Sequence, residues 1–208
     1  MRTANSDIAF SDSVKAAQAR LGSREKYARH ALSEEDDWAS EITDALAEFI
    51  AARDTCFLAT ASAAGVPYVQ HRGGPPGFLR VLDPTTLAFA DFSGNRQYIT
   101  LGNLAENPRA VLFLLDYRNR RRVKIWGTAR VVEGDAALLE QLTPPGYSAR
   151  VERAIVFHVA AWDANCPAHI QRRFTEQELL DATEGMRLRI AELEREVAAL
   201  REAAKNRG

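Results

Sequence analysis

The side chains best suited to hold a ligand lie in four short segments of the chain. They are Gln70, His71 and Arg72; Ser93, Asn95, Arg96 and Gln97; Asn103; and Arg122 with Lys124. Each segment places a cation or an amide at an expected strand end or strand-to-helix turn, and nearby glycines let the backbone approach a ligand closely. Because an arginine can bind two phosphate oxygens at once, the pattern favours a phosphate site. The alternative is that these arginines are solvated and that Gly94-Asn95 only marks a turn.

Motifs of the common enzyme classes are missing from the sequence. It contains no GxGxxG after an opening strand, no GxxxxGK followed by Ser or Thr, no HExxH and no GxSxG. The four histidines, His30, His71, His158 and His169, do not have the spacing of metal ligands. The sequence therefore disfavours a dinucleotide enzyme, a zinc protease and a triad hydrolase, and it predicts no metal site.

The composition is that of a globular protein with balanced charge. Of the 208 residues, 46% are hydrophobic, which allows one sizeable core with appendages. The 27 lysines and arginines nearly equal the 28 aspartates and glutamates, so no overall field would attract nucleic acid or an anionic membrane. The sequence has no apolar run that could span a bilayer, and its first residues lack the apolar centre of a signal peptide. We therefore expect a cytoplasmic protein without nucleic-acid or membrane partners.

The two cysteines, Cys56 and Cys166, lie far apart and form no CxxC or Cys/His cluster. This spacing argues against a structural zinc site or a disulfide framework. Cys56 stands in an apolar run and is expected to be a plain core residue. A catalytic role for Cys166 is disfavoured because no base can be identified for it.

Seven stretches rich in Val, Ile, Phe, Tyr and Thr alternate with turn-forming residues, which predicts β-strands. The expected strands cover residues 55–61, 66–72, 78–82, 86–91, 109–116, 122–133 and 150–162. Short turns between neighbouring strands imply antiparallel pairing, and about seven strands favour a barrel or sandwich over a parallel α/β sheet. Helical patterns at residues 96–107 and 135–142 interrupt the series.

Helical structure is also expected before the strands. Residues 1–32 form a partly helical arm, with Ser11 as an N-cap and Gly22 as a break, that packs against a partner surface or is partly disordered. Ser33 and Asp36 then match a capping box ahead of apolar residues at helical spacing. The pattern predicts one amphipathic helix that starts at Ser33 and ends near Arg53.

The tail from Thr175 has a different pattern, which begins with a second capping box formed by Thr175 and Glu178. The apolar residues then fall on two seven-residue repeats: Leu179, Met186, Leu193 and Leu200, and Ile190 with Val197. β-branched residues at a and Leu at d favour two parallel helices. In this register opposite charges face each other in the pairs Arg189–Glu194 and Glu196–Arg201. The sequence leaves open an intersubunit coiled coil and a helix lying on its own barrel.

The chain is therefore expected to be mainly β with flanking helices. It divides into the arm at residues 1–32, a barrel with its N-terminal helix at 33–165, and a linker with an amphipathic or coiled-coil helix at 166–208. The last helix is an expected interaction surface in either arrangement.

The order of several motifs resembles the pyridoxamine 5'-phosphate oxidase-like FMN-binding family. The matching stretches are PYVQHRG, LAFAD, SGNR, LGNL, NPR and RVKIWGTAR, and the resemblance covers about residues 40–165. It implies an antiparallel split β-barrel that pairs with a second subunit about a two-fold axis. It also implies one FMN in each of the two clefts at the interface of this homodimer.

Carried over to this chain, the resemblance implies roles for individual residues. Gln70, His71 and Arg72 would run along the isoalloxazine ring. The phosphate and ribityl chain would meet Ser93, Asn95, Arg96 and Gln97, with Arg96 as the main phosphate partner and Asn103 nearby. Arg122, Lys124 and Trp126 would approach the flavin from a facing strand.

Two departures from the family's pattern bear on the substrate. Arg96-Gln97 stands where the oxidases proper carry Arg-Lys, and their C-terminal substrate-phosphate motif has no match here. Oxidation of vitamin B6 is therefore disfavoured. Residues 162–174, which include Trp162, Cys166 and His169, lie where family members complete the site from the partner subunit. This segment faces a ligand, or Pro167 simply ends the strand there.

Three functions remain open on the sequence alone. The leading hypothesis is an FMN-dependent oxidoreductase with a small-molecule substrate or electron donor, in which the flavin supplies the chemistry. The second is a non-catalytic flavin or haem binder, in which His71, His158 or His169 would serve as the iron ligand. The third is an adaptor that acts through its C-terminal helix.

Overall fold

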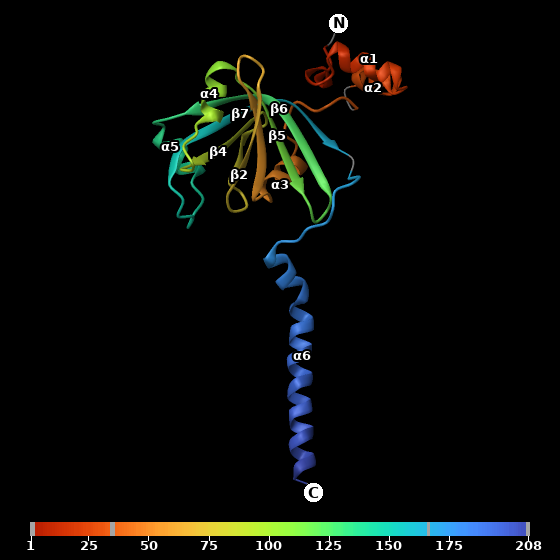
Figure 1. Ribbon diagram of the computed structural model, residues 1–208, viewed down its shortest axis with the longest axis vertical. Helices are drawn as coiled ribbons and strands as arrows, with labels where there is room; N and C mark the ends of the chain where they lie inside the picture. Colours follow the sequence, from red (N-terminus) through yellow and green to blue (C-terminus); the bar gives the residue numbers. More distant parts are fainter. Residues whose placement is uncertain (1–2, 34–35, 166, 207–208) are drawn as a thin grey trace.

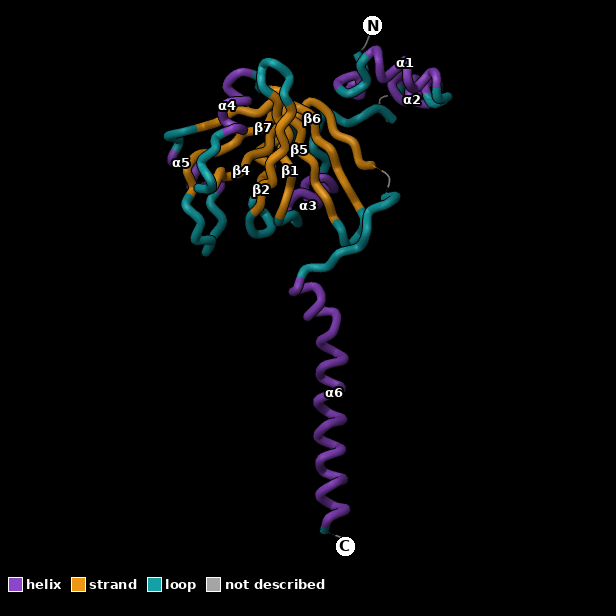
Figure 2. Tube along the Cα trace, in the orientation of Figure 1, coloured by secondary structure: helices purple, strands orange, loops and turns teal. Residues whose placement is uncertain are grey.

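A sheet of seven antiparallel strands forms the body of the protein (Figure 1). The computed structural model describes residues 3–33, 36–165 and 167–206. The strands are β1 (Thr55–Ala61), β2 (Pro67–Gly73), β3 (Leu79–Asp83), β4 (Thr86–Phe92), β5 (Arg109–Asp116), β6 (Arg121–Val132) and β7 (Val151–Asn165). They pair in the order β2-β1-β5-β6-β7-β4-β3, and the sheet curls round on itself (Figure 2). The fold is the predicted antiparallel split barrel with flanking helices and a long C-terminal helix.

Alternation of side chains along the strands builds the core. In β1, Cys56, Leu58 and Thr60 are buried, and the residues between them are only half-buried. The largest fully buried side chains include Phe78, Phe89, Phe157, Leu112, Ile125 and Ile155. Burial of each such side chain contributes about 2 kcal/mol to folding. Cys56 is fully buried, as the sequence predicts, and burial raises the pKa of its thiol to about 12.

The sheet does not close into a complete barrel, because β2 and β3 are its two edges. β3 pairs with β4 only from Thr86 to Phe89. The end of β4 lies near β2 instead, and there the Arg72 guanidinium forms an ion pair with the Asp91 carboxylate. We call this opening between β2 and residues 90–92 the seam.

The helix before β1 is shorter than the sequence predicts. α3 (Asp44–Ala51) begins where the Thr43 hydroxyl accepts a hydrogen bond from the Leu46 N–H at 3.3 Å. The Ser33 hydroxyl does accept from the Asp36 N–H at 3.2 Å, but residues 36–43 are not helical. The expected helix from Ser33 is therefore wrong over this stretch. The chain leaves the helical conformation there because the Trp38 ring stacks on the Trp126 ring, at a centroid distance of 4.5 Å.

Two short helices flank the sheet. α4 (Ile99–Glu106) packs near β1 and β6, and α5 (Ala136–Leu142) packs on β4 and β7. The sequence predicts a helix over residues 96–107, but α4 begins only at Ile99. The helix starts later than predicted because Arg96 and Tyr98 both have a positive φ (59° and 55°), which a right-handed helix does not allow.

The N-terminal arm packs on the body of its own chain. It contains the short 3-10 helix η1 (Asn5–Ile8), α1 (Asp12–Arg20) and α2 (Arg24–Leu32), with Ser11 as the N-cap of α1 and Gly22 at the break. The Asp37 carboxylate accepts hydrogen bonds from the N–H groups of Asn5 (2.7 Å) and Ser6 (3.2 Å). Burial alone would raise the pKa of Asp37, but these donors outweigh burial and lower it.

The C-terminal helix projects away from the sheet (Figure 1). α6 (Glu176–Lys205) starts at the predicted capping box, in which the Thr175 hydroxyl accepts from the Glu178 N–H. Near its start, Glu178 forms an ion pair with Arg118 at 3.3 Å. The apolar residues further along α6 are exposed, so the expected alternative of a helix lying on its own barrel is not observed.

None of the described helices combines the length and the apolar character that crossing a membrane requires.

Candidate functional site

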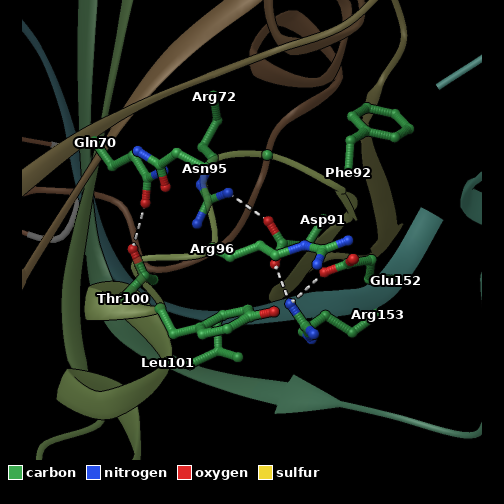
Figure 3. A pocket seen from close by; sticks show the side chains of 12 residues that line it. Gln70, Arg72, Asp91, Phe92, Asn95, Arg96, Thr100, Leu101, Glu152 and Arg153 are labelled. Carbon is green, nitrogen blue, oxygen red and sulfur yellow. Dashed lines mark hydrogen bonds and ion pairs between the residues drawn. The ribbon is translucent and has the colours of Figure 1, made fainter. Parts of the chain in front are cut away.

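A pocket opens at the seam and collects side chains from distant parts of the chain (Figure 3). β2 supplies Gln70 and Arg72, β4 supplies Asp91 and Phe92, and β7 supplies Glu152 and Arg153. The remaining lining residues follow β4 in sequence and are Gly94, Asn95, Arg96, Tyr98, Thr100 and Leu101. We call this the seam pocket. It forms because the open edge of the sheet faces the loop at residues 93–98 and the start of α4.

A buried ionic network forms one wall of the seam pocket. Asp91 is 4% exposed and forms ion pairs with both Arg72 and Arg153, the latter at 3.2 Å. Arg153 also contacts Glu133 at 2.9 Å and Glu152 at 3.2 Å. Figure 3 shows the Asp91 carboxylate between the two guanidinium groups. Because each of these charges has an opposite charge beside it, the ion pairs offset part of the cost of removing the groups from water.

Positive charge exceeds negative charge in the seam pocket. Three arginines line it, Arg72, Arg96 and Arg153, against two carboxylates, Asp91 and Glu152. Arg72 and Arg153 share Asp91, whereas Arg96 is exposed and has no ion pair within the described part of the chain. The Nε atom of Arg72 is buried without a hydrogen-bond acceptor. The pocket thus offers an uncompensated cation, which suits an anionic ligand with acceptor oxygens.

The loop from residue 93 to 98 presents backbone groups to the same pocket. The Asn95 side-chain oxygen accepts a hydrogen bond from the Gln97 N–H at 3.2 Å and holds the turn. Tyr98 is the N-cap of α4, and its side chain makes no capping hydrogen bond. The first N–H groups of α4 are therefore available to an acceptor, and Thr100 and Leu101 of this first turn line the pocket.

Four of the predicted site residues meet in the seam pocket, namely Gln70, Arg72, Asn95 and Arg96. The Gln70 side-chain oxygen accepts a hydrogen bond from the Thr100 hydroxyl at 2.7 Å, which ties β2 to α4. The predicted residues Ser93 and Gln97 lie on the same loop, where they support their neighbours. The Ser93 N–H donates to the Arg150 carbonyl oxygen at 2.8 Å, and the Asn95 side-chain amide donates to the Gln97 side-chain oxygen at 3.3 Å.

Two other predicted residues lie outside the seam pocket. The Asn103 side chain is 8% exposed and donates to the Thr60 hydroxyl at 3.0 Å, so it fastens α4 to β1. His71 lies on the opposite face of β2 from Gln70 and Arg72, where its ring contacts the hydroxyl of Thr55. Alternation along a strand explains this separation.

The remaining predicted residues, Arg122, Lys124 and Trp126, share the outer face of β6, apart from the seam pocket. The Lys124 ammonium lies 5.2 Å from the centre of the Trp126 ring. Across the sheet, Trp126 is level with Val111 of β5 and Ala59 of β1. We call the outward side of β1, β2, β5 and β6 the outer face. Its members Phe57, Val111 and Phe113 are half-buried, and Val69 of β2 is 61% exposed.

The described residues of the segment 162–174 are not among those that line the seam pocket. The Trp162 indole N–H donates to the Glu41 carbonyl oxygen at 2.8 Å, and its ring packs against the core. Trp162 therefore supports the chain before α3. His169 is exposed, with a φ of 65°. Cys166 lies outside the described residues, and so does any prediction about its role.

Sequence reasoning missed Asp91, Glu152 and Arg153 as site residues. Asp91 follows the apolar run Leu87–Ala90 in β4, and a carboxylate in such a strand signals a buried partner. No local sequence pattern identifies Arg153 as a site residue, because β7 reaches the site only through its long-range pairing with β4.

Solved structures similar to this chain include the following three. A putative pyridoxamine 5'-phosphate oxidase from Lactobacillus delbrueckii is 20% identical, with a TM-score of 0.47, over 60% of this chain and 95% of that one. An FMN-binding protein from Syntrophomonas wolfei is 14% identical, with a TM-score of 0.48, over 71% and 97%. A HupZ structure from Group A Streptococcus is 17% identical, with a TM-score of 0.48, over 59% and 93%.

The comparison with curated proteins gives no match. The sequence model of one family, described as pyridoxamine 5'-phosphate oxidase, matches residues 42–182. This range includes every strand and all of the seam pocket. The chain therefore belongs to the pyridoxamine 5'-phosphate oxidase family, as its sequence motifs predict.

Proposed function

We propose that this protein is an FMN-binding oxidoreductase that holds the flavin in the seam pocket, between two subunits. The proposal rests mainly on the unpaired charge of Arg96, which is the lining arginine without an ion pair among the described residues and lies beside the uncapped start of α4. A phosphate monoester supplies the negative charge and the acceptor oxygens that both groups lack.

The residues along β2 fit the flat part of a flavin. β2 is an edge strand, so alternate backbone N–H and C=O groups on its free side have no strand partner. The isoalloxazine ring has donors and acceptors along one edge, which an extended strand can match. The Arg72 side chain of this strand also lines the seam pocket. These features support placing the ring along β2 and the phosphate at Arg96.

One subunit provides only part of the enclosure. The seam pocket has a volume of about 180 Å³, whereas pockets that enclose a small molecule typically measure about 300–1,000 Å³. The outer face offers candidates for the missing wall, because Val69 is exposed there and Lys124 and Trp126 are only half-buried, with the Trp126 ring stacked on Trp38. We infer that two outer faces pair about a two-fold axis and that each flavin is covered by Lys124 and Trp126 of the second chain.

The flavin, when bound, supplies hydride or single-electron transfer with a small-molecule substrate or donor. The work of the protein is to hold the phosphate at Arg96, to align the ring along β2 and to exclude water on the covered side. Gln97, in the position of the lysine in the oxidases proper, is engaged with Asn95. The C-terminal substrate-phosphate motif of the oxidases proper has no match in this sequence, which supports a substrate other than a vitamin B6 phosphate.

A mixed dimer tests whether the site is shared between subunits. Arg96→Ala and Trp126→Leu chains carrying different tags are expressed together, and the heterodimer is isolated by both tags. If the two residues act from different chains, the heterodimer has one intact site, so it should bind one FMN at wild-type affinity. Neither homodimer should do so. Flavin fluorescence quenching during titration measures both affinity and stoichiometry.

A heterodimer without a tight site would contradict the shared site, and so would chains that fail to form dimers. Trp126 also stacks on Trp38, so its replacement could loosen the arm. Lys124→Ala removes a neighbouring contact from the same face and serves as the second partner variant. The same heterodimer result is expected from it.

A further inference from the structure

α6 exposes an apolar stripe that nothing in its own chain covers among the described residues. The helix has 30 residues, so it is about 45 Å long. Its apolar residues are widely exposed: Leu179 57%, Met186 61%, Ile190 56%, Leu193 42%, Val197 44% and Leu200 70%. An isolated helix in water gains little from its own hydrogen bonds, so a helix of this length needs a partner surface.

The stripe has the period of a two-stranded coiled coil. Leu179, Met186, Leu193 and Leu200 recur every seven residues, and Ile190 with Val197 forms the second series. This assigns Leu or Met to position d and β-branched residues to position a, the combination that selects parallel dimers. A helix built to lie on a globular surface would use a wider apolar face.

We propose that α6 pairs in parallel with α6 of a second copy of this chain. The partner follows from charge as well as from the apolar repeat. In the parallel register Arg189 at g faces Glu194 at e of the second copy, and Glu196 faces Arg201. A second copy of the same helix therefore matches both the stripe and the charges beside it.

The direction of pairing follows from the rest of the chain. Antiparallel helices could also match Arg189 with Glu196, so these charges do not decide the direction. Within one dimer of barrels, however, antiparallel helices would hold their N-termini about 45 Å apart. Only residues 166–175 connect β7 to α6. The choice of the parallel direction thus rests on the proposed barrel dimer, whereas the helix pairing itself does not.

Disulfide cross-linking of the full chain tests both the pairing and its direction. In a Cys166→Ser background, Leu200→Cys places identical thiols side by side in the parallel coil, and nearly all of the chain should migrate as a dimer after mild oxidation. Leu188→Cys is the matched control, because Leu188 is 65% exposed but lies off the a and d positions. It should remain mostly monomeric on the same gel.

Other cross-linking results would overturn the proposal. In the antiparallel alignment, Leu200 faces Thr183 and the two Leu200 positions are about 25 Å apart. Cross-linking of Leu200→Cys chains to Thr183→Cys chains, without Leu200 homodimers, would therefore reverse the direction. Equal cross-linking of Leu188→Cys and Leu200→Cys would indicate random collision, and no cross-linking of either would show that α6 binds something else.

Circular dichroism provides a second readout that does not depend on flavin. The double variant Ile190→Asp, Leu193→Asp should lose most of the helical signal of α6, whereas Leu188→Asp should keep it. FMN content should remain close to wild type in both variants, because these residues lie away from the seam pocket. Loss of flavin with α6 still paired would count against the proposed function alone. An unchanged helical signal in the double variant would overturn the coiled coil.

Discussion

Replacing Arg96 by alanine is expected to weaken FMN binding by about 2 kcal/mol, which is about 30-fold in the dissociation constant. The reason is that Arg96 is the arginine of the seam pocket whose charge is not balanced within the described part of the chain. Without it, the phosphate would face Arg72 and Arg153, which already share Asp91. Titration of the apoprotein followed by flavin fluorescence measures the effect.

Riboflavin provides the internal control for this prediction. It has the same ring and ribityl chain but lacks the phosphate, so Arg96→Ala should leave its affinity almost unchanged. Arg20→Ala is the matched control variant, because Arg20 is an exposed arginine on α1, away from the seam pocket. Equal losses for FMN and riboflavin would show that Arg96 does not bind the phosphate.

Gly127→Ala is expected to destabilise the barrel by about 3 kcal/mol. A Cβ at this position would lie 1.9 Å from the His158 carbonyl oxygen and 2.8 Å from Cε1 of Phe157. The first of these atoms belongs to the backbone of β7, so a rotamer change cannot relieve the contact. Gly127 lies at the register shift between β6 and β7, which lets the two backbones approach so closely. Chemical denaturation measures the free energy of unfolding.

Gly102→Ala is the matched control for this effect. Gly102 lies inside α4 and has no atom within 4 Å of an added Cβ. Alanine should therefore stabilise the protein there by about 0.5–1 kcal/mol, because it restricts the unfolded chain. If Gly127→Ala unfolds at the same denaturant concentration as wild type, the close approach of β6 and β7 is not a constraint on this fold.

The strands could be predicted from the sequence because each of them carries its own signal. β5 has the predicted bounds, residues 109–116, since apolar residues alternate there between the core and the outer face. Glycines in the turns mark the ends of neighbouring strands, and this signal is also local in sequence. A local pattern was also enough to predict the N-cap of α6, where the Thr175 and Glu178 side chains both make their predicted hydrogen bonds.

The errors arose where long-range contacts override a local pattern. Ser33 and Asp36 carry a capping signal, yet the next residues leave the helix so that Trp38 can stack on Trp126 and Asp37 can bind the arm. The start of α4 was likewise predicted too early. The helical period continues into the loop after Asn95, but the backbone there turns through the left-handed region at Arg96.

The candidate site was predictable only in the part that is local in sequence. Asn95 and Arg96 follow a strand and a glycine, so their place beside a helix start can be inferred from the sequence. The ion pairs around Asp91 could not be inferred from the sequence, because they join β2, β4 and β7, which meet only at the seam. The resemblance to a known family supplied Trp126, on a face that a single chain does not bring to the pocket.

Flavin binding can be measured by an absorption spectrum of the purified protein, followed by release and identification of any chromophore. We expect paired flavin bands in the near ultraviolet and the blue, with one FMN released per chain. A Soret band would instead indicate haem and assign the barrel to a different cofactor. A colourless protein that FMN cannot reconstitute would contradict the proposed function.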